Sequence, residues 1–219
     1  MCRMYKNFIF DLDGTLLETL PDIVTAINAA LKECGFDYVY DIESGKKLIG
    51  DGVANLMHRA LKDKDSPENF EAIKRVFMPL YQEYQTKTTK AMKGCVETLS
   101  SLKNKGCGLY VCTNKPNHLA LEVLDNIFGP NTFDFIKGLK EGEAPKPDKH
   151  NVDVIMEGYH LDPKETLFVG DSMTDYNTAR NGGLAFCLCV YGYGNYTSEF
   201  IAKSDYNIKE PKELLNLAK

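Results

Sequence analysis

The segment Phe8-Ile9-Phe10-Asp11-Leu12-Asp13-Gly14-Thr15 decides the fold of this chain. Its first three residues form a short apolar run, which is typical of a strand buried on both faces of a parallel sheet. Two carboxylates, Asp11 and Asp13, follow at once, and residues two apart in extended backbone point to the same side. We therefore expect a buried strand that ends at a small polar site.

Strand-sized apolar runs recur along the chain, with helical patterns between them. The further runs are Leu109–Cys112, Phe133–Ile136, Thr166–Val169 and Leu184–Leu188. An alternation of short strands and helices favours a parallel sheet with helices on both faces, so we predict an α/β, Rossmann-like core.

Residues 17–89 interrupt this alternation, because they contain no convincing strand. Apolar residues at helical spacing predict one helix over 20–34 and another over 53–61. Ser66-Pro67 opens a further helix, which Pro79 is expected to kink or end. We predict an all-helical domain here, inserted into a core made of residues 1–16 and 90–219.

Composition and charge limit the classes of partner. The 219 residues are 43% hydrophobic and carry a formal charge of −5, which fits a globular protein and does not favour nucleic acid or an anionic membrane. No run approaches the length of a spanning helix, and the N-terminus lacks the apolar core of a signal peptide.

The number of cysteines is odd, and no Cys-x-x-Cys pair occurs. They are Cys2, Cys34, Cys95, Cys107, Cys112, Cys187 and Cys189. Such usage predicts reduced, mostly buried thiols and a cytoplasmic protein.

Polar residues follow three of the predicted strands or lie in a loop between them. Thr113-Asn114-Lys115 follows the second run, Lys146 lies in the loop Ala144–Asp148, and Asp171 and Asp175 follow the run that ends at Val169. Ligands of open parallel sheets bind at the carboxyl ends of the strands, so we expect these side chains to meet Asp11 and Asp13.

The chemistry of this set points to phosphoryl transfer. Converging carboxylates repel one another and gather cations, and an all-oxygen site suits Mg²⁺. A lysine, a hydroxyl and an amide suit an anionic phosphoryl group. One carboxylate could attack phosphorus, while a second exchanges protons with the leaving group and with water.

These residues resemble the four motifs of haloacid-dehalogenase-superfamily phosphatases, in the order of that superfamily and over essentially the whole chain. The resemblance implies that Asp11 is the nucleophile and a metal ligand, and that Asp13 is the acid/base with its main-chain carbonyl on the metal. It implies phosphate binding by Thr113, Asn114 and Lys146. It also implies Mg²⁺ binding by Asp171, with Asp175 close by, and a helical cap over residues 17–89.

The inserted segment indicates which group of this superfamily the chain resembles. Leu20–Leu31, Ile49–Gly52 and Arg59–Leu61 are similar to cap segments of phosphoglycolate phosphatases. The implied activity is Mg²⁺-dependent hydrolysis of a small phosphate monoester through an aspartyl-phosphate intermediate, with phosphoglycolate as the first candidate substrate. We expect the protein to be a monomer or a homodimer. The roles of Asp51 and Arg59 stay open, as turn and surface residues or as parts of a substrate loop.

Two other functions use similar residues. A sugar phosphomutase shares the core. Phosphomutases of this superfamily, however, carry a histidine a dozen residues after the nucleophile, where this chain has Ile23. A phospho-aspartate signalling domain also holds acidic residues, a threonine and a lysine at strand ends, but the inserted helices and the Asp11/Asp13 spacing speak against it.

Overall fold

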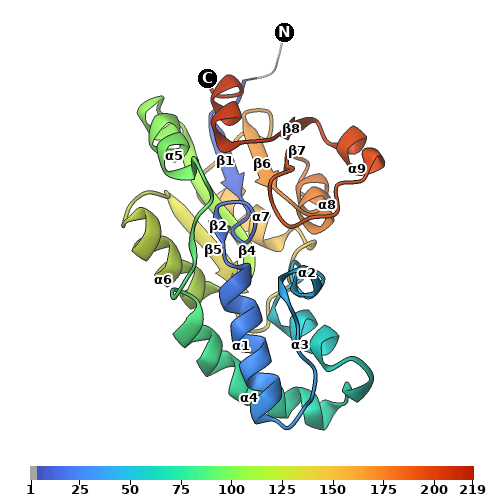
Figure 1. Cartoon of the computed structure of the whole chain (residues 1–219). Coiled ribbons are helices and arrows are strands. Elements are labelled where there is room, and N and C mark those ends of the chain that lie inside the picture. Colours follow the sequence, from blue (N-terminus) through green and yellow to red (C-terminus); the bar gives the residue numbers. More distant parts are fainter. Residues whose placement is uncertain (1–3) are drawn as a thin grey trace. The chain divides into compact units, whose positions relative to one another are not determined.

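The computed structural model describes residues 4–219 and divides them into two compact units. One unit consists of Ala91–Lys219 together with the residues up to Leu17, and the other is Glu18–Lys90. Figure 1 shows both units, with helices and strands labelled where there is room. The first unit is an α/β core and the second is built from helices, so the predicted α/β class with a helical insert is confirmed.

The core is a parallel sheet with β1 near its centre. Its strands are β1 (Asn7–Phe10), β4 (Gly108–Pro116), β5 (Phe135–Leu139), β6 (Thr166–Gly170), β7 (Ala185–Cys189) and β8 (Tyr206–Ile208). Their order in the sheet is β5-β4-β1-β6-β7-β8, and each neighbouring pair is parallel. Phe10 lies opposite Val111 of β4 and Val169 of β6, so these three strands run side by side in register.

Alternate residues of each strand enter different apolar layers, as expected for a sheet covered on both faces. In β1, Phe8 and Phe10 pack with α5 (Cys95–Asn104) and α6 (Asn117–Phe128). Ile9 packs on the other face, where helices α7 (His150–Gly158), α8 (Met173–Asn181) and α9 (Ser198–Lys203) contribute. Both faces of the central strand are therefore dry, and only its ends can carry polar chemistry.

Several strands differ from the sequence prediction, among them the short β2 (Leu17–Glu18) at the start of the segment predicted to be all-helical. β5 begins at Phe135, two residues later than expected, and β4 continues to Pro116 with a register shift after Cys112. Thr113 and Asn114 thus lie within the extended end of β4. The short β8 was not predicted, because its three residues carry too little pattern to distinguish a strand from a loop.

The second unit contains four α-helices among the described residues: α1 (Leu20–Glu33), α2 (Ile42–Gly45), α3 (Val53–Leu61) and α4 (Pro67–Tyr84). α1 and α4 pack along each other. Pro79 lies inside α4, which continues to Tyr84, so the proline does not end the helix. The chain enters and leaves this unit through the paired strands β2 (Leu17–Glu18) and β3 (Lys90–Ala91).

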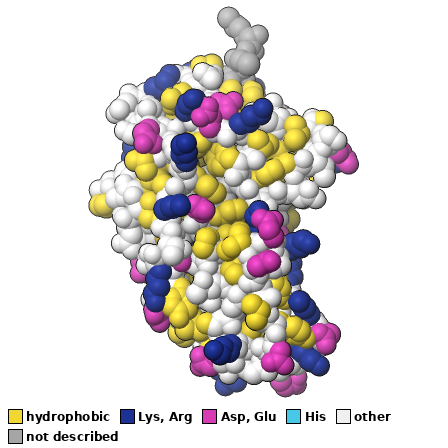
Figure 2. Space-filling model, viewed as in Figure 1, with side chains coloured by type: hydrophobic (Ala, Val, Ile, Leu, Met, Phe, Trp, Pro, Cys, Tyr) yellow, Lys and Arg dark blue, Asp and Glu magenta, His cyan; other side chains and the backbone are white. Residues whose placement is uncertain are grey.

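Charged side chains of both signs are interspersed on the face shown in Figure 2. Exposed pairs such as Lys46 with Glu43 and Lys87 with Glu83 contribute roughly 0–1 kcal/mol each. The apolar layers therefore carry the stability of the fold. None of the helices within residues 4–219 is long and apolar enough to cross a membrane.

The cysteines within residues 4–219 carry free thiols, and all of these except Cys34 are buried. Burial raises the pKa of the Cys95 and Cys112 thiols to about 12. These two thiols are therefore protonated and unreactive at neutral pH. Cys2 lies outside the described residues.

Asp22 ties the two ends of the helical unit together. Its buried carboxylate accepts hydrogen bonds from the main-chain N–H and the hydroxyl of Thr88, and from the same two groups of Thr89, at 2.6–3.1 Å. Burial raises the pKa of the Asp22 carboxyl, but these hydrogen bonds more than offset it, and the pKa lies below its usual 3.8.

We expect Asp22→Asn to lower the free energy of unfolding by about 2 kcal/mol at pH 7, because an amide NH₂ would face donors that now meet a charged acceptor. The depressed pKa makes this contribution complete above pH 3.8 and loses it as the pH falls through the lower folded pKa. Urea unfolding from pH 7 to pH 3 measures both effects. The exposed Asp37→Asn serves as the control, and an equal loss at both ends of the pH range would contradict the prediction.

Candidate active site

Three carboxylates meet where β1 and β6 end. Asp11 follows β1 and Asp171 follows β6, so the parallel pairing of these strands places them side by side. Asp175 lies in the first turn of α8, and a reciprocal cap joins it to Ser172, which precedes the helix. All three aspartates are buried, and one oxygen from each lies within 4.8 Å of the others.

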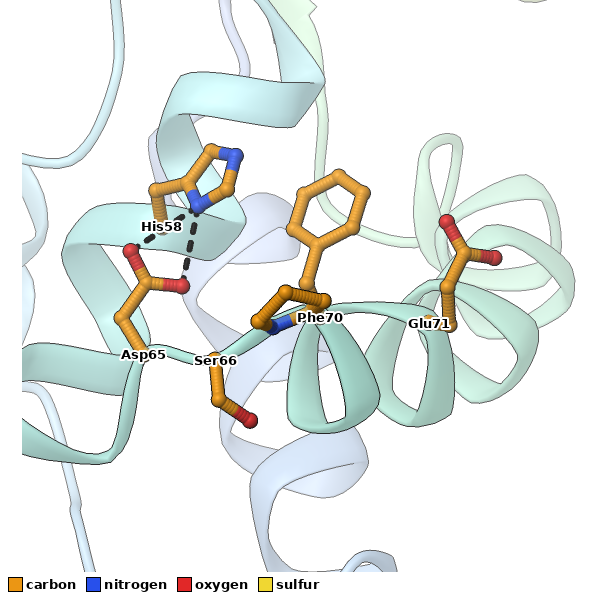
Figure 3. A pocket seen from close by; sticks show the side chains of 6 residues that line it. His58, Asp65, Ser66, Phe70 and Glu71 are labelled. Carbon is orange, nitrogen blue, oxygen red and sulfur yellow. Dashed lines mark hydrogen bonds and ion pairs between the residues drawn. The ribbon is translucent and has the colours of Figure 1, made fainter.

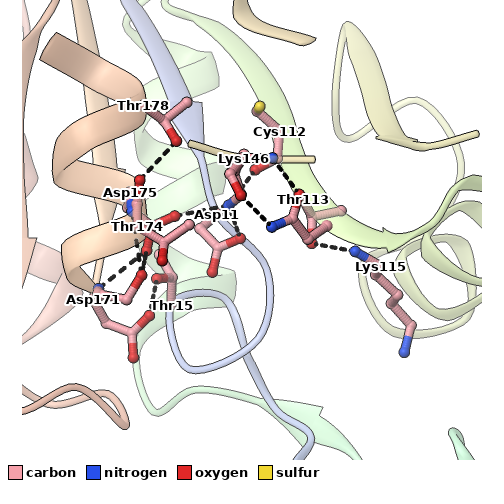
Figure 4. Close-up of polar contacts among 12 residues, drawn as sticks. Asp11, Thr15, Cys112, Thr113, Lys115, Lys146, Asp171, Thr174, Asp175 and Thr178 are labelled. Atoms are coloured by element: carbon pink, nitrogen blue, oxygen red, sulfur yellow. Dashed lines mark hydrogen bonds and ion pairs between the residues drawn. The ribbon is translucent and has the colours of Figure 1, made fainter. Parts of the chain in front are cut away.

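The Lys146 ammonium lies between two of these carboxylates, as Figure 4 shows. Its Nζ donates to Asp11 Oδ1 at 2.6 Å and to Asp175 Oδ1 at 2.7 Å. A third hydrogen bond reaches the Cys112 carbonyl oxygen at 3.0 Å. The residue is 3% exposed, so this lysine is an internal counter-ion and not a solvated loop residue.

One ammonium does not balance the buried negative charge. Burial, and then the neighbouring Asp175, raise the pKa of Asp11 to about 7, although Lys146 opposes the shift. Burial also raises the pKa of Asp171 well above its usual range, with Asp175 and Asp11 adding to the effect. Burial lowers the pKa of Lys146, but the two carboxylates that it contacts outweigh burial. The pKa of Lys146 therefore lies above its usual 10.5, and the lysine stays charged.

This arrangement fits a divalent cation. The donors are carboxylate oxygens, which Mg²⁺ prefers, and burial together with mutual repulsion raises the pKa of Asp11 and Asp171, so their charged forms lack full compensation by Lys146. A cation held among the three aspartates would favour their ionised forms. The residues therefore support a metal site.

Asp13 lies outside this group of three but close enough to raise the pKa of Asp11. Its Oδ1 is buried and has no hydrogen-bond partner among the described residues. Buried polar atoms are nearly always paired, and an unpaired carboxylate oxygen fits a group that exchanges protons with a bound molecule. The resemblance implies that Asp13 contributes its main-chain carbonyl to the metal, and this stays a prediction.

Asn114 and Thr113 occupy the end of β4, the strand next to β1. The Asn114 side chain bonds the main chain of Lys146 in both directions: Oδ1 accepts from its N–H at 2.7 Å, and Nδ2 donates to its carbonyl at 3.1 Å. The Thr113 hydroxyl accepts from the N–H of Lys115 at 3.2 Å. Asn114 thus fixes the segment that carries the lysine, while the Thr113 hydroxyl retains its own proton for another acceptor.

Some parts of the site have no signal in a single sequence. The Cys112 carbonyl binds Lys146, and the Tyr193 main-chain N–H binds Asp171 at 2.6 Å. Main-chain groups are present at almost every position, so residue type does not reveal them. The Thr15 hydroxyl, which donates to Asp171 at 3.3 Å, could have been singled out because it belongs to the first quoted motif.

Within the helical unit, Arg59 organises the loop that precedes α3. Its guanidinium donates to the Leu48 and Ile49 carbonyl oxygens at 3.2 and 3.4 Å and pairs with the Asp51 carboxylate. Asn55 also donates to the Asp51 carbonyl at 2.9 Å. Asp51 and Arg59, whose roles the sequence left open, therefore both stabilise the loop before α3 within this unit.

A hollow of about 370 Å³ lies on the helical unit. Figure 3 shows the side chains that line it. His58 Nδ1 lies 2.9 Å from both carboxylate oxygens of Asp65, and its ring stacks on Phe70 with centroids 4.3 Å apart. These contacts explain the histidine as a packing residue of α3 and α4, in line with the absence of metal-ligand spacing in the sequence.

The fold and the site together define an α/β protein with a Rossmann-like parallel sheet and a buried carboxylate centre where its strands end. Residues 8–189 match the family model described as haloacid dehalogenase-like hydrolase, and the chain belongs to this family. The resemblance found in the sequence is thereby confirmed.

Curated relatives include a phosphoglycolate phosphatase of Aquifex aeolicus, 33% identical over 97% of this chain and 96% of that protein. Another of that name, from Nitrosospira multiformis, is 34% identical over 86% of this chain and 84% of its own length. A crystal structure of a predicted phosphoglycolate phosphatase from Haemophilus somnus covers 97% of both chains at 30% identity, with a TM-score of 0.89.

We expect Mg²⁺ to stabilise the protein in the absence of substrate, because an ion that binds only the folded state raises the free energy of unfolding. At about 100 times the dissociation constant the gain is about 2.7 kcal/mol. Thermal unfolding with and without Mg²⁺ measures it. Asp171→Asn should abolish the gain, while Asp125→Asn on the exposed side of α6 should keep it. An equal gain in all three proteins would contradict a metal site at Asp171.

Proposed function

We propose that this chain is a Mg²⁺-dependent phosphatase of small phosphate monoesters, with phosphoglycolate as its first candidate substrate. One observation carries the proposal: a buried Asp11, bonded to Lys146, lies against the carboxylates of Asp171 and Asp175. The names of the relatives support the choice of phosphoglycolate.

In the proposed reaction, one carboxylate oxygen of Asp11 attacks the phosphorus of the ester. A phosphorus–oxygen bond to Asp11 forms as the bond to the substrate alkoxide breaks. Lys146 supports this step, because its charge lowers the pKa of Asp11 against the effects of burial and of Asp175. Its charge thereby favours the ionised form of the attacking group, against burial and the neighbouring carboxylates that raise the pKa.

Asp13 would move the protons. Its carboxyl group donates a proton to the departing alkoxide and becomes a carboxylate. That carboxylate then accepts a proton from the water that attacks the phosphorus of the aspartyl-phosphate. Inorganic phosphate leaves, and Asp11 returns to a carboxylate while Asp13 returns to its acid form. The unpaired Oδ1 of Asp13 supports this assignment.

The residues proposed to hold the metal are Asp11, Asp171 and Asp175 through their carboxylates and Asp13 through its main-chain oxygen. When bound there, Mg²⁺ supplies positive charge that offsets repulsion between the Asp11 carboxylate and the phosphoryl oxygens.

Thr113 would bind a phosphoryl oxygen through the proton of its hydroxyl. Lys146 lies beside the nucleophile and would bind a phosphoryl oxygen in exchange for one of its three present hydrogen bonds. We assign Asn114 an indirect part in phosphate binding, since its side-chain amide bonds the main chain of Lys146.

Phosphate release from a panel of small esters, with and without EDTA, tests the function. We expect phosphoglycolate to give the highest kcat/KM, and EDTA to abolish turnover. Asp11→Asn should lower kcat by orders of magnitude, since removal of a nucleophile costs up to about 10⁶-fold in hydrolases. Metal-independent turnover, or isomerisation of a sugar phosphate without phosphate release, would contradict the proposal.

Asp13→Asn should separate the two steps. With p-nitrophenyl phosphate the phenolate leaves without a proton, so the variant should release a burst close to the enzyme concentration. Its steady rate should then fall roughly 10²–10⁴-fold, because water attack lacks its base. Stopped-flow absorbance measures both phases. A variant with the steady rate of the wild type would show that Asp13 is not the base.

A further inference from the structure

The segment 190–196, between β7 and α9, packs its backbone against Asp171. A Cβ atom on Gly192 would lie 2.5 Å from the Asp171 Cβ and Oδ2 atoms, and one on Gly194 would lie 2.0 Å from the Asp171 main-chain oxygen. These distances are far below van der Waals contact. Only glycine permits the backbone to come this close.

The residue between these glycines donates a hydrogen bond into the site. The Tyr193 main-chain N–H binds Asp171 Oδ2 at 2.6 Å, while the Thr15 hydroxyl binds Oδ1 at 3.3 Å. Gly14 completes the enclosure, because a Cβ there would lie 2.5 Å from the same Oδ2. Two chain segments therefore hold both oxygens of one carboxylate.

The tyrosines of the segment anchor it. The Tyr191 hydroxyl donates to the Thr15 carbonyl oxygen at 3.1 Å, and the Tyr196 hydroxyl accepts from the Gly194 N–H at 3.0 Å. These contacts give the Gly- and Tyr-rich stretch a defined place beside the carboxylate cluster.

We propose that the segment 190–196 is a positioning element of the metal site, and this rests on the proposed metal-dependent function. Asp171 lies beside the carboxylates of Asp11 and Asp175, and their mutual repulsion favours rotation of its side chain away from them. The Tyr193 N–H, brought close by Gly192 and Gly194, opposes that rotation. The segment thus presents Asp171 to the ion in one orientation before the ion arrives.

The test is the affinity of the full chain for Mg²⁺ alone, measured by calorimetry without substrate. We expect Gly192→Ala to weaken binding about 10–100-fold, as loss of a group that orients a metal ligand typically does. Gly158→Ala is the matched control: a Cβ there has open space, and its affinity should equal that of the wild type. Circular dichroism and urea unfolding of the metal-free proteins report whether the variants are folded.

Tyr191→Phe keeps the ring and removes the hydroxyl that donates to the Thr15 carbonyl oxygen and also contacts the Cys95 and Cys189 thiols, so it tests the same idea with less disturbance of the backbone. We expect a several-fold weaker affinity for Mg²⁺ in a protein with the circular dichroism of the wild type. Wild-type affinity in folded Gly192→Ala or Tyr191→Phe would overturn the positioning role alone. A wild-type chain that binds no Mg²⁺ would overturn the metal-dependent function and this inference together.

Discussion

The repulsion among three buried carboxylates is the constraint on which the site depends. Asp11, Asp171 and Asp175 lie in a region that water does not screen, and the Lys146 ammonium bridges two of them. Taking charges out of water costs several kcal/mol per ion unless partners compensate. The fold tolerates the cluster because the dry layers on both faces of the sheet hold the strands in register. The excess negative charge of this cluster favours a bound cation, whose positive charge would in turn be needed before an anionic group could enter.

The parallel sheet makes this convergence possible across a long stretch of sequence. β1 has β4 on one side and β6 on the other, so residues that follow all three strands share one edge. Lys146 comes from the segment after β5, and the Asn114 amide fixes that segment to β4. A lysine held in this way keeps its ammonium between two carboxylates without relying on its flexible side chain alone. Positioning by a neighbour is therefore a repeated device here, used for Lys146 by Asn114 and for Asp171 by Thr15.

Much of the fold could be predicted from the sequence, because apolar runs such as Phe8–Phe10 report burial directly. The same holds for Asp11 and Asp171, since a carboxylate that directly follows a buried strand is placed at the sheet edge where ligands bind. Predictions stayed incomplete where tertiary contacts outweigh local preference. The sequence left open whether Pro79 kinks or ends its helix, and α4, which packs along α1, continues past the proline. The contact of Asn114 with Lys146 joins residues 32 apart, and no local pattern reports such a pair.

The hydrogen bonds of Asp22 with Thr88 and Thr89 hold the two ends of the helical unit together, which affects how the sequence of such a protein can evolve. Because the helical unit leaves and rejoins the chain at neighbouring points, its length and shape place no strain on the strand order of the core. Helices can be exchanged, lengthened or redesigned there while β1 and its acidic end keep their place. The α/β core can in this way stay constant in evolution, while selectivity for different molecules evolves in the separate helical unit.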